Sequence, residues 1–539
     1  DGVALFANGG GNRRHWIDVR VRGEVDQRGG GRVNHLGVGS LIEVKAGSMY
    51  RARLVSEQVT HLGLGKHRQA DVVRVVWTNG VPQAIVGPKP DQTLCEVHKT
   101  VEGSCPYVYA WNGEAFEFVT DLLWNAPLGL QIVEGVFAQP RAWEFLKIDG
   151  ERLRPREGKY ALQFTSELWE ADYFDQVELI AVDHPADVQI FSNEKVGPAE
   201  IAQFQVHTVR QPRLPVAARN KLGEDVLPTI READQVYLKG YTQIHRPGLA
   251  DEHYLELDLG DLQGARQITL FLTGWIYPSD TSIRVGASQN PNWPQPKPPA
   301  LAVPDSQGVW QEVRPFMGFP GGKPKTIAVD LSDAFLTDDF RLRIVTNWEI
   351  YWDHVFFTVD EEPAPLQLTT IPVAGADLHF RGFSAIRRRG LENPEHYDYG
   401  TVTTSPRWPP MFGRFTRYGD ITSLLHQADD LLAILSPGDE MTLTFDVPSE
   451  PVPDGWKRDF LLHNVGWDKD AVLNTLYGQT VEPLPFQGMS GYPYGPDEAY
   501  PQTPRHLEYL RQYQTRTQSP ARFWNWIRDH TPQTPALRP

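Results

Sequence analysis

Cysteine is nearly absent from this chain, which has two cysteines in 539 residues. So low a number excludes a disulfide-rich scaffold, and it excludes iron–sulfur clusters and zinc sites built on cysteine. There is no Cys-x-x-Cys-His motif, so covalently attached haem is excluded as well. Cys95 and Cys105 lie ten residues apart, and two free buried thiols or one short disulfide loop are both compatible with that spacing.

Long apolar runs are also missing. No stretch reaches the roughly 18 to 20 apolar residues that cross a bilayer as a helix. The longest runs, such as residues 431–435, have the length of a strand, so we expect no membrane span. The first residues, Asp1–Phe6, include neither an initiator Met nor the basic and apolar regions of a signal peptide. A start inside a strand suggests a fragment, and the alternative is that the sequence simply begins there.

Basic charge is scarce, because 52 Lys and Arg residues face 68 Asp and Glu residues and the net charge is −16. Such a chain repels phosphate backbones and anionic lipid, so we expect no nucleic-acid partner. The only compact basic run, Arg387–Arg389, is typical of a solvated loop.

The common catalytic and nucleotide-binding motifs are missing too. We find no phosphate-binding Gly-x-x-x-x-Gly-Lys-Ser/Thr loop, no His-Glu-x-x-His, and no Gly-x-Gly-x-x-Gly that opens a helix, so neither NAD nor a nucleotide is expected. The segment 488–491 reads Gly-Met-Ser-Gly among prolines and tyrosines. It lacks the Gly-x-Ser-x-Gly spacing of a hydrolase nucleophile.

Strand-like alternation of apolar and polar residues dominates what is present, for example in residues 17–22, 40–45 and 72–77. The pattern predicts a mainly β protein with several sandwich-like or barrel-like domains in tandem and a short C-terminal helical segment. We place the domains at 1–90 (β-domain), 91–235 (β-rich, with the Cys95–Cys105 loop), 236–362 (jelly-roll-like β-sandwich) and 363–539 (Pro- and aromatic-rich).

Local signals add detail to these domains. Asn112-Gly113 between two aromatic runs predicts a hairpin. In the third domain, residues 254–259, 267–272, 282–285, 325–330 and 341–345 have sandwich-like spacing, and residues 347–357 are similar to the closing strands of a galactose-binding-like jelly roll. A helix is expected near 421–427. Helix-spaced apolar residues over 504–530, including Phe523, Trp526 and Ile527, predict one or two helices.

The N-terminal region resembles the ASPIC/UnbV domain. The resemblance rests on NRRHWIDVR at 12–20, GVGS at 37–40, HLGLG at 61–65 and VRVVWTNG at 73–80. In that family, which includes cartilage acidic protein-like proteins, the domain follows an FG-GAP β-propeller in secreted or surface proteins. The resemblance implies an extracytoplasmic location. It also implies that the chain is the C-terminal part of a longer precursor, with an FG-GAP propeller from the same precursor as partner. Residues 26–33 depart from the family's usual turn, and no reaction is implied.

The family's location bears on the two cysteines. In an oxidising compartment, a bond between Cys95 and Cys105 would stabilise the fold by roughly 2 to 3 kcal/mol. The extracytoplasmic context therefore favours the disulfide over two free buried thiols.

An acidic segment near the C-terminus offers the best candidate metal site. Asp468, Asp470 and Asn474 can supply three oxygen ligands from one turn, and Ca²⁺ prefers several oxygen ligands at once. The spacing differs from that of an EF-hand. The alternative is a solvated acidic turn capped by its own side chains.

Aromatic residues suggest where a ligand would bind. Trp275, Tyr277, Trp293 and Trp310 lie in or near the loop-rich part of the third domain, and flat aromatic rings stack on sugars and anchor protein interfaces. We predict a glycan-binding or partner-binding surface there, although most aromatics of a sandwich are core residues.

Three functions remain open on the sequence alone. The first is a non-catalytic binding or structural protein that contacts proteins or glycans. The second is a carbohydrate-active hydrolase with the third domain as its sugar-binding module, for which Glu349 and Asp353 are a candidate carboxylate pair. The third is a subunit of a larger homo- or hetero-oligomeric surface assembly, held together by an extended arm that contains Tyr492, Tyr494 and Tyr500.

Thiol counting under denaturing conditions tests the disulfide. We expect the protein purified from its natural source to contain no free thiol, because Cys95 and Cys105 are paired. Two reactive thiols per chain would contradict both the bond and the extracytoplasmic location.

Overall fold

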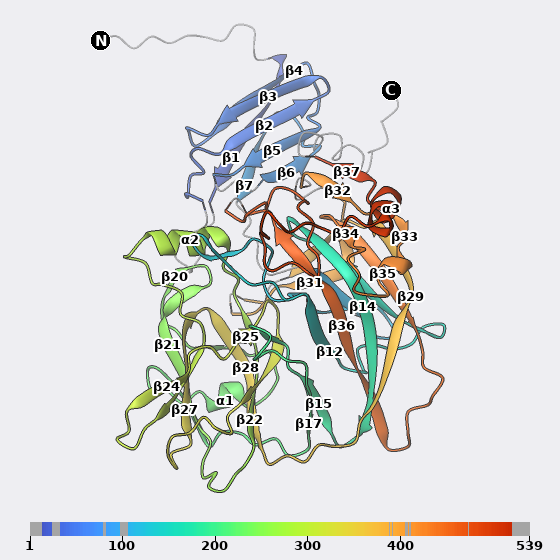
Figure 1. Ribbon diagram of the computed structural model, residues 1–539. Helices are drawn as coiled ribbons and strands as arrows, with labels where there is room; N and C mark the ends of the chain where they lie inside the picture. The colour runs from blue at the N-terminus through green and yellow to red at the C-terminus, as the bar shows by residue number, and fades with distance from the viewer. Residues whose placement is uncertain are drawn as a thin grey trace, which may run out of the picture. The chain divides into compact units, whose positions relative to one another are not determined.

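The computed structural model describes residues 13–23, 33–78, 82–97, 106–387, 389–390, 392–404, 408, 411–472 and 474–519. Strands hold 48% of the residues and helices 5%, which confirms the predicted mainly β fold. The chain forms two compact units, one built mostly from residues 1–101 and the other from most of the remainder. Each unit is described by itself (Figure 1).

The N-terminal unit has two sheets. One has the strand order β4-β1-β7 and the other β3-β2-β5-β6. Val19, Val44 and Val75 belong to its core. β7 pairs in parallel with β1, so the sheet continues beyond the predicted boundary at residue 90. The strands are β1 (His15–Arg22), β2 (Leu41–Ala46), β3 (Met49–Leu54), β4 (Thr60–Gly65), β5 (Val72–Val76), β6 (Pro82–Val86) and β7 (Gln92–Val97).

The larger unit contains a nearly closed eight-stranded barrel. Its strand order is β12-β36-β14-β29-β35-β13-β8-β9, and several of these strands are seen side by side in Figure 1. Strands from the predicted second and fourth domains are neighbours in this sheet, so the two ranges share one core. The strands are β8 (Tyr107–Trp111), β9 (Phe116–Asp121), β12 (Trp143–Ile148), β13 (Lys159–Thr165), β14 (Glu170–Pro185), β29 (Gln367–Phe380), β35 (Asp439–Asp446) and β36 (Trp456–Asp470).

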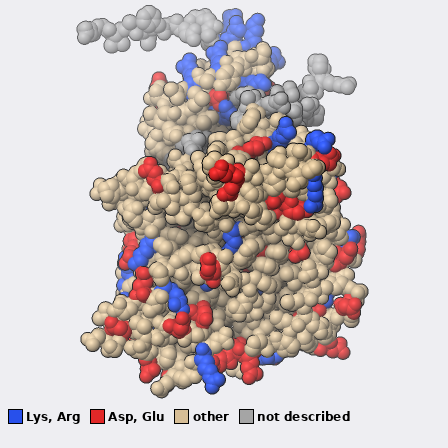
Figure 2. Space-filling view, viewed as in Figure 1, with Lys and Arg blue, Asp and Glu red and all other residues tan. Residues whose placement is uncertain are grey.

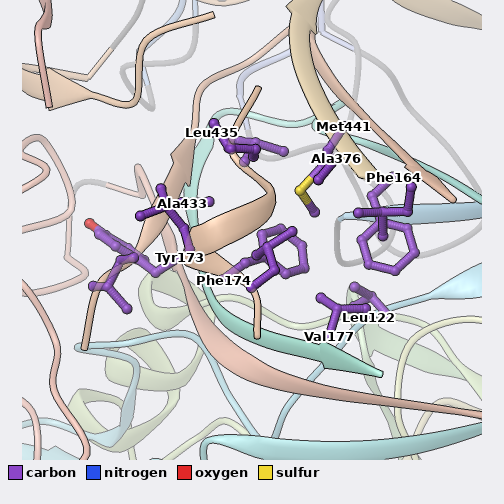
Figure 3. Close-up of a cluster of buried hydrophobic side chains, with 14 of the residues drawn as sticks. Leu122, Phe164, Tyr173, Phe174, Val177, Ala376, Ala433, Leu435 and Met441 are labelled. Atoms are coloured by element: carbon purple, nitrogen blue, oxygen red, sulfur yellow. The ribbon is translucent and has the colours of Figure 1, made fainter. Parts of the chain in front are cut away.

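Apolar side chains fill the barrel. Phe164, Phe174, Leu435 and Met441 are fully buried members of this core, and Figure 3 shows them clustered together. The register of β14 against β36 shifts between Phe174 and Gln176, so Asp175 forms a bulge. The bulge changes which residues of β14 face the core.

The turn between β8 and β9 confirms the predicted hairpin. The Asn112 side-chain oxygen accepts hydrogen bonds from the N–H groups of Glu114 and Ala115, both at 2.8 Å. Gly113 has a φ of 108°, a conformation that glycine adopts without strain.

A two-sheet β-sandwich is inserted between β14 and β29 of the barrel. Its sheets have the orders β18-β21-β27-β23-β24 and β19-β28-β22-β26, with β20 beside β21. Leu257, Leu272 and Ile344 belong to its core. The strands are β18 (Ala217–Asn220), β19 (Leu238–Lys239), β20 (Ile244–Arg246), β21 (Leu249–Asp258), β22 (Ile268–Ile276), β23 (Ala300–Pro304), β24 (Trp310–Arg314), β26 (Lys325–Asp330), β27 (Arg341–Trp348) and β28 (Ile350–Val359).

Two local predictions were wrong. Residues 282–285 lie in helix α2 (Thr281–Gln289), because Asp280 accepts the N–H of Ile283 as a cap and Ile283 and Ala287 are buried at helical spacing. Residues 421–427 contain only a short 3₁₀ turn, Thr422–Leu424.

The C-terminal helix was predicted correctly over its first part. Helix α3 (Pro504–Gln512) begins after Thr503, whose hydroxyl accepts the N–H of His506. β37 (Arg516–Gln518) then pairs with β32 (Gly413–Phe415). Phe523, Trp526 and Ile527 lie outside the described residues. In the described part of the chain, no helix has the length and apolar character needed to cross a bilayer.

Short elements complete the larger unit. They are helix α1 (Leu227–Ile230), β33 (Gly419–Asp420), β34 (Ala433–Leu435), and the pairs β10 (Gln131–Val133) with β11 (Val136–Phe137), β15 (Gln189–Ser192) with β17 (Val206–Val209), β16 (Lys195–Val196) with β25 (Phe319–Pro320) and β30 (Phe383–Arg387) with β31 (His396–Thr403).

A substitution in β36 tests the barrel packing. A Cβ atom at Gly466 would lie 2.2 Å from the Tyr173 carbonyl oxygen and 2.8 Å from the Trp124 ring. We expect Gly466→Ala to lower the free energy of unfolding by about 3 kcal/mol in a denaturant titration, because the backbone must shift. Gly495→Ala is the control, since no atom lies within 4 Å of its Cβ position. Equal stability of the two variants would contradict this packing.

Candidate ligand pocket

A pocket of about 370 Å³ lies in the larger unit, beside the arm formed by residues 476–502. Its size falls within the usual range of small-molecule sites. Residues from β32, β34, α3 and the arm line it: Arg414, Ile434, Glu482, Pro483, Leu484, Tyr494, Glu498, Ala499, Tyr500, Gln502, Leu510 and Gln514.

Tyrosine hydroxyl groups fix the aromatic walls of the pocket. Tyr500 is buried and donates to the carbonyl oxygen of Asp430. Tyr494 donates to the carbonyl oxygen of Leu484 at 3.2 Å. Because both hydroxyl groups donate to backbone carbonyl oxygens, the two rings are held in place. Their apolar faces line the pocket.

Lys469 and Asp175 anchor the arm to the barrel. The Lys469 ammonium group, which is buried, donates to the Val481 carbonyl oxygen and to the Tyr492 hydroxyl, both at 2.9 Å. Asp175, the bulge residue of β14, accepts the side-chain amide of Gln487 at 2.8 Å. The arm therefore packs on the barrel of its own chain.

Asp175 also holds the turn before β34. Its carboxylate accepts the N–H groups of Asp429 and Asp430 at 3.0 and 2.9 Å. Burial raises the pKa of Asp175 to about 7, and the hydrogen bond from Gln487 offsets part of that rise.

The innermost polar group of the pocket, Gln514, is saturated with hydrogen bonds. Its amide nitrogen lies 2.8 Å from the Leu432 carbonyl oxygen and 2.9 and 2.6 Å from the hydroxyl groups of Thr416 and Tyr509, so its two N–H groups have three acceptors within reach. This part of the wall is rigid and has little capacity left for a ligand.

The uncommitted polar groups of the pocket are charged. The exposed Arg414 guanidinium and the Glu482 carboxylate make no hydrogen bond or ion pair with other described residues. Gly413 allows the close approach of Glu482, since a Cβ atom there would lie 2.7 Å from the Glu482 Oε2 atom. Glu498 differs, because the Ser490 hydroxyl and N–H both donate to it and lower its pKa.

The four aromatic residues predicted to bind a ligand lie in different surroundings. Trp275 and Tyr277 are 4% and 1% exposed and pack with Tyr351 in an aromatic cluster of the sandwich. Trp293 is half-buried beneath the Arg246 guanidinium, and Trp310 is half-buried beside Arg343. A ligand surface at Trp293 or Trp310 stays a prediction.

The two members of the candidate carboxylate pair, Glu349 and Asp353, lie in different surroundings. Glu349 is fully buried and accepts hydrogen bonds from the Tyr351 hydroxyl at 2.8 Å and the Gly248 N–H at 3.0 Å. Asp353 accepts the Gln235 N–H at 2.9 Å, and burial raises its pKa to about 6.

The three predicted Ca²⁺ ligands, Asp468, Asp470 and Asn474, lie in separate surroundings. Asp468 is 1% exposed within β36. Asp470 accepts the Val472 N–H at 3.0 Å and the Thr475 hydroxyl at 2.6 Å, as in a self-capped turn. The Asn474 amide donates to the Ser282 hydroxyl at 3.0 Å. Across the described ranges, no group of three or more His, Cys, Asp or Glu residues is placed to hold a metal ion.

The two cysteines are only partly described. Cys95 lies exposed on β7, whereas Cys105 lies outside the described residues. The disulfide stays a prediction.

Sequence reasoning missed the pocket. Arg414 and Glu482 are far apart in the sequence and belong to no motif. The available signal was the alternation of proline and tyrosine in residues 483–501, which predicted an arm but not the surface that it covers.

Comparisons with known proteins give little. No family model matches the chain, and no curated protein does. One solved structure with which it aligns is the single-particle cryo-EM structure of the arabinofuranosyltransferase AftD from Mycobacteria, at 9% identity and a TM-score of 0.14. The alignment covers 79% of this chain and 30% of the AftD chain. So weak a likeness carries no argument about fold or activity.

Removing the Asp175 carboxylate tests how the arm is held. Asp175→Ala leaves three donors without their acceptor, so we expect it to cost about 3 kcal/mol and to make residues 476–502 sensitive to limited proteolysis. Asp175→Asn keeps one acceptor oxygen and should be cleaved more slowly. Equal resistance of the wild type and Asp175→Ala would show that the arm is held by other contacts.

Proposed function

We propose that this chain is a non-catalytic, extracytoplasmic binding protein that holds a carbohydrate in the pocket beside the arm. The observation that carries the proposal is the combination of fixed tyrosine walls with the uncommitted groups of Arg414 and Glu482. Sugars offer apolar ring faces that stack on aromatic side chains. They also offer adjacent hydroxyl groups that a planar guanidinium or carboxylate can bind at two points.

The charge distribution supports a saccharide over a nucleic acid. Among the described residues that line it, the pocket has one cation, Arg414, and two carboxylates, Glu482 and Glu498. Figure 2 shows Lys and Arg side chains of the larger unit scattered among acidic ones on the face in view, without a continuous basic patch. A polyanion gains little attraction from such a surface.

The ASPIC/UnbV resemblance supplies the setting of the proposal. We propose that the N-terminal unit is such a domain and that the chain belongs to a larger FG-GAP propeller-containing surface protein or assembly. Within the HLGLG motif, His61 on β4 lies opposite Asp18 on β1, and their side chains are 2.7 Å apart. Trp16 lies beside the His61 ring. These contacts give motif residues a shared structural role.

A carbohydrate-active hydrolase is the second candidate, because Glu482 and Glu498 both line the pocket. Glycoside hydrolysis needs one carboxyl group that donates a proton and a second that acts as base or nucleophile. The hydrogen bonds from Ser490 lower the pKa of Glu498, which suits it to the ionised role only. Glu482 would have to be the acid.

Arginine substitution tests carbohydrate binding. We expect Arg414→Ala to weaken the binding of a saccharide at least about tenfold, because charge-assisted hydrogen bonds are lost. The saccharide is first selected from a panel of neutral and acidic oligosaccharides, and affinity is measured by calorimetry. Arg511→Ala is the control, since Arg511 is exposed on α3 and pairs with Glu508. The absence of any binding saccharide, or equal affinity of Arg414→Ala and wild type, would contradict the proposal.

Incubation with the selected saccharide separates binding from hydrolysis. For a binding protein we expect the saccharide to be recovered intact after prolonged incubation, with wild type and with Glu482→Gln alike. Release of reducing ends by wild type, and its loss in Glu482→Gln, would establish the hydrolase instead.

A further inference from the structure

Two aspartates face each other inside the barrel, at a place that the pocket does not use. Asp172 on β14 lies directly opposite Asp468 on β36. They are 0% and 1% exposed. None of their four carboxylate oxygens has a hydrogen-bond donor in favourable geometry among the described residues. We refer to Asp172 and Asp468 as the acid pair.

The acid pair points into the apolar interior. Phe174, two residues after Asp172 on the same face of β14, belongs to the barrel core. Gly466, two residues before Asp468 on the same face of β36, lies under the ring of Trp124, another core residue. Core side chains therefore lie beside both carboxyl groups on this face.

The titratable groups around the acid pair are acidic. The charge of Asp439, at the start of β35, raises the pKa of Asp172. Asp470 and Glu144, the latter on β12, act on Asp468. Each of these carboxylates opposes ionisation of the pair. The Ser166 hydroxyl carries no charge. It lowers the pKa of Asp172 by less than burial raises it.

The nearby cations are engaged elsewhere. Lys469 follows Asp468 but points to the opposite face of β36, where it binds the arm. Arg516 pairs with Asp439 at 2.5 Å. Lys325 and Arg141 act on Glu144, and Lys325 forms its ion pair with Asp121. The charges that act most strongly on Asp172 and Asp468 include no cation.

Two ionised carboxylates cannot remain side by side in such surroundings without a counter-ion, because desolvation and mutual repulsion both act against them. The described residues offer no metal-binding group of three or more ligands. We propose that Asp172 and Asp468 form a proton-binding site that holds at least one proton at neutral pH and releases it in alkaline solution. The two carboxyl groups then titrate as a unit.

The directions of the pKa shifts of Asp172 and Asp468 agree with this proposal. Burial raises the pKa of Asp172 to about 8, and burial and the Asp172 charge raise that of Asp468 above its ordinary range. The unfolded chain has lost these protons at pH 7, since an ordinary aspartate titrates near 3.8. The native state therefore binds more protons, and stability falls as the pH rises from about 4 to about 8.

Asp172→Asn mimics the protonated form and is the first test. Between pH 6 and 8 we expect the unfolding equilibrium constant of Asp172→Asn to rise less steeply with pH than that of wild type, by up to about tenfold per pH unit, because the variant lacks one of the two titrating carboxyl groups. Asp446→Asn is the control, because Asp446 is exposed and pairs with Lys159. Equal pH dependence of Asp172→Asn and wild type would overturn the proposal.

Infrared spectroscopy tests the site with the acid pair intact, in case Asp172→Asn does not fold. Burial also raises the pKa of Glu144 and of Asp175 to about 7, so the variant Glu144→Gln/Asp175→Asn is used to remove their contribution. At pH 7.5 we expect the carbonyl stretch of a protonated carboxyl group to persist in this variant, and its absence would overturn the proposal.

Calcium addition tests the alternative that a cation neutralises the acid pair. We expect CaCl₂ and EDTA to leave the unfolding temperature of the full chain unchanged at pH 7.5. A rise with CaCl₂ that Asp172→Asn abolishes would show that a cation, and not a proton, neutralises the acid pair, and would overturn the proposal.

Discussion

The pairing of β14 with β36 is the constraint on which the larger unit depends. These strands run antiparallel from Glu170 opposite Asp470 to Pro185 opposite Trp456, with one bulge. β36 also pairs with β12, and β14 with β29 and β34. The acid pair, the Asp175 bulge and the Lys469 anchor of the arm are all on these two strands. Their register therefore decides the barrel core and the position of the pocket wall together.

Buried charge joins the barrel to the inserted sandwich. The Lys325 ammonium group at the start of β26 contacts the Asp121 carboxylate at the end of β9 at 2.5 Å, and both are almost fully buried. The backbone N–H of Lys323 donates to the same carboxylate at 3.0 Å. A buried pair of this kind adds little net stability, but loss of one partner is costly, so it specifies one arrangement of the two parts. Gly322 allows the approach, since a Cβ there would lie 2.1 Å from Asp121 Oδ2.

The sequence allowed the strands to be predicted better than their partners. Alternation in residues 17–22, 72–77 and 325–330 identified β1, β5 and β26, because half-buried strands impose a period of two on the chain. The same alternation predicted a strand at residues 282–285, although a helix capped by Asp280 begins there. Local patterns also do not reveal that β13 pairs with β35, so the barrel was divided between two predicted domains.

The candidate sites also depend on contacts between distant parts of the sequence, which local patterns do not reveal. Trp275 and Tyr277 were predicted from residue type, but exposure depends on packing against Tyr351, which is distant in the sequence. Asp468 was singled out as acidic and near other oxygen ligands. Its actual neighbour, Asp172, lies on another strand almost three hundred residues earlier, and only the pairing of β14 with β36 brings the two together.

The insertion of the sandwich into the barrel has a consequence for synthesis on the ribosome. Leu162 pairs with Leu443 and Leu179 with Leu462, so β13 and β14 emerge long before the strands that complete them. The sandwich, whose last strand ends at Val359, has all its strands available first. During that interval the early barrel strands present unpaired edges, which is the state in which β proteins aggregate. In a nascent chain the early barrel strands therefore stay without their partners until β36 has emerged.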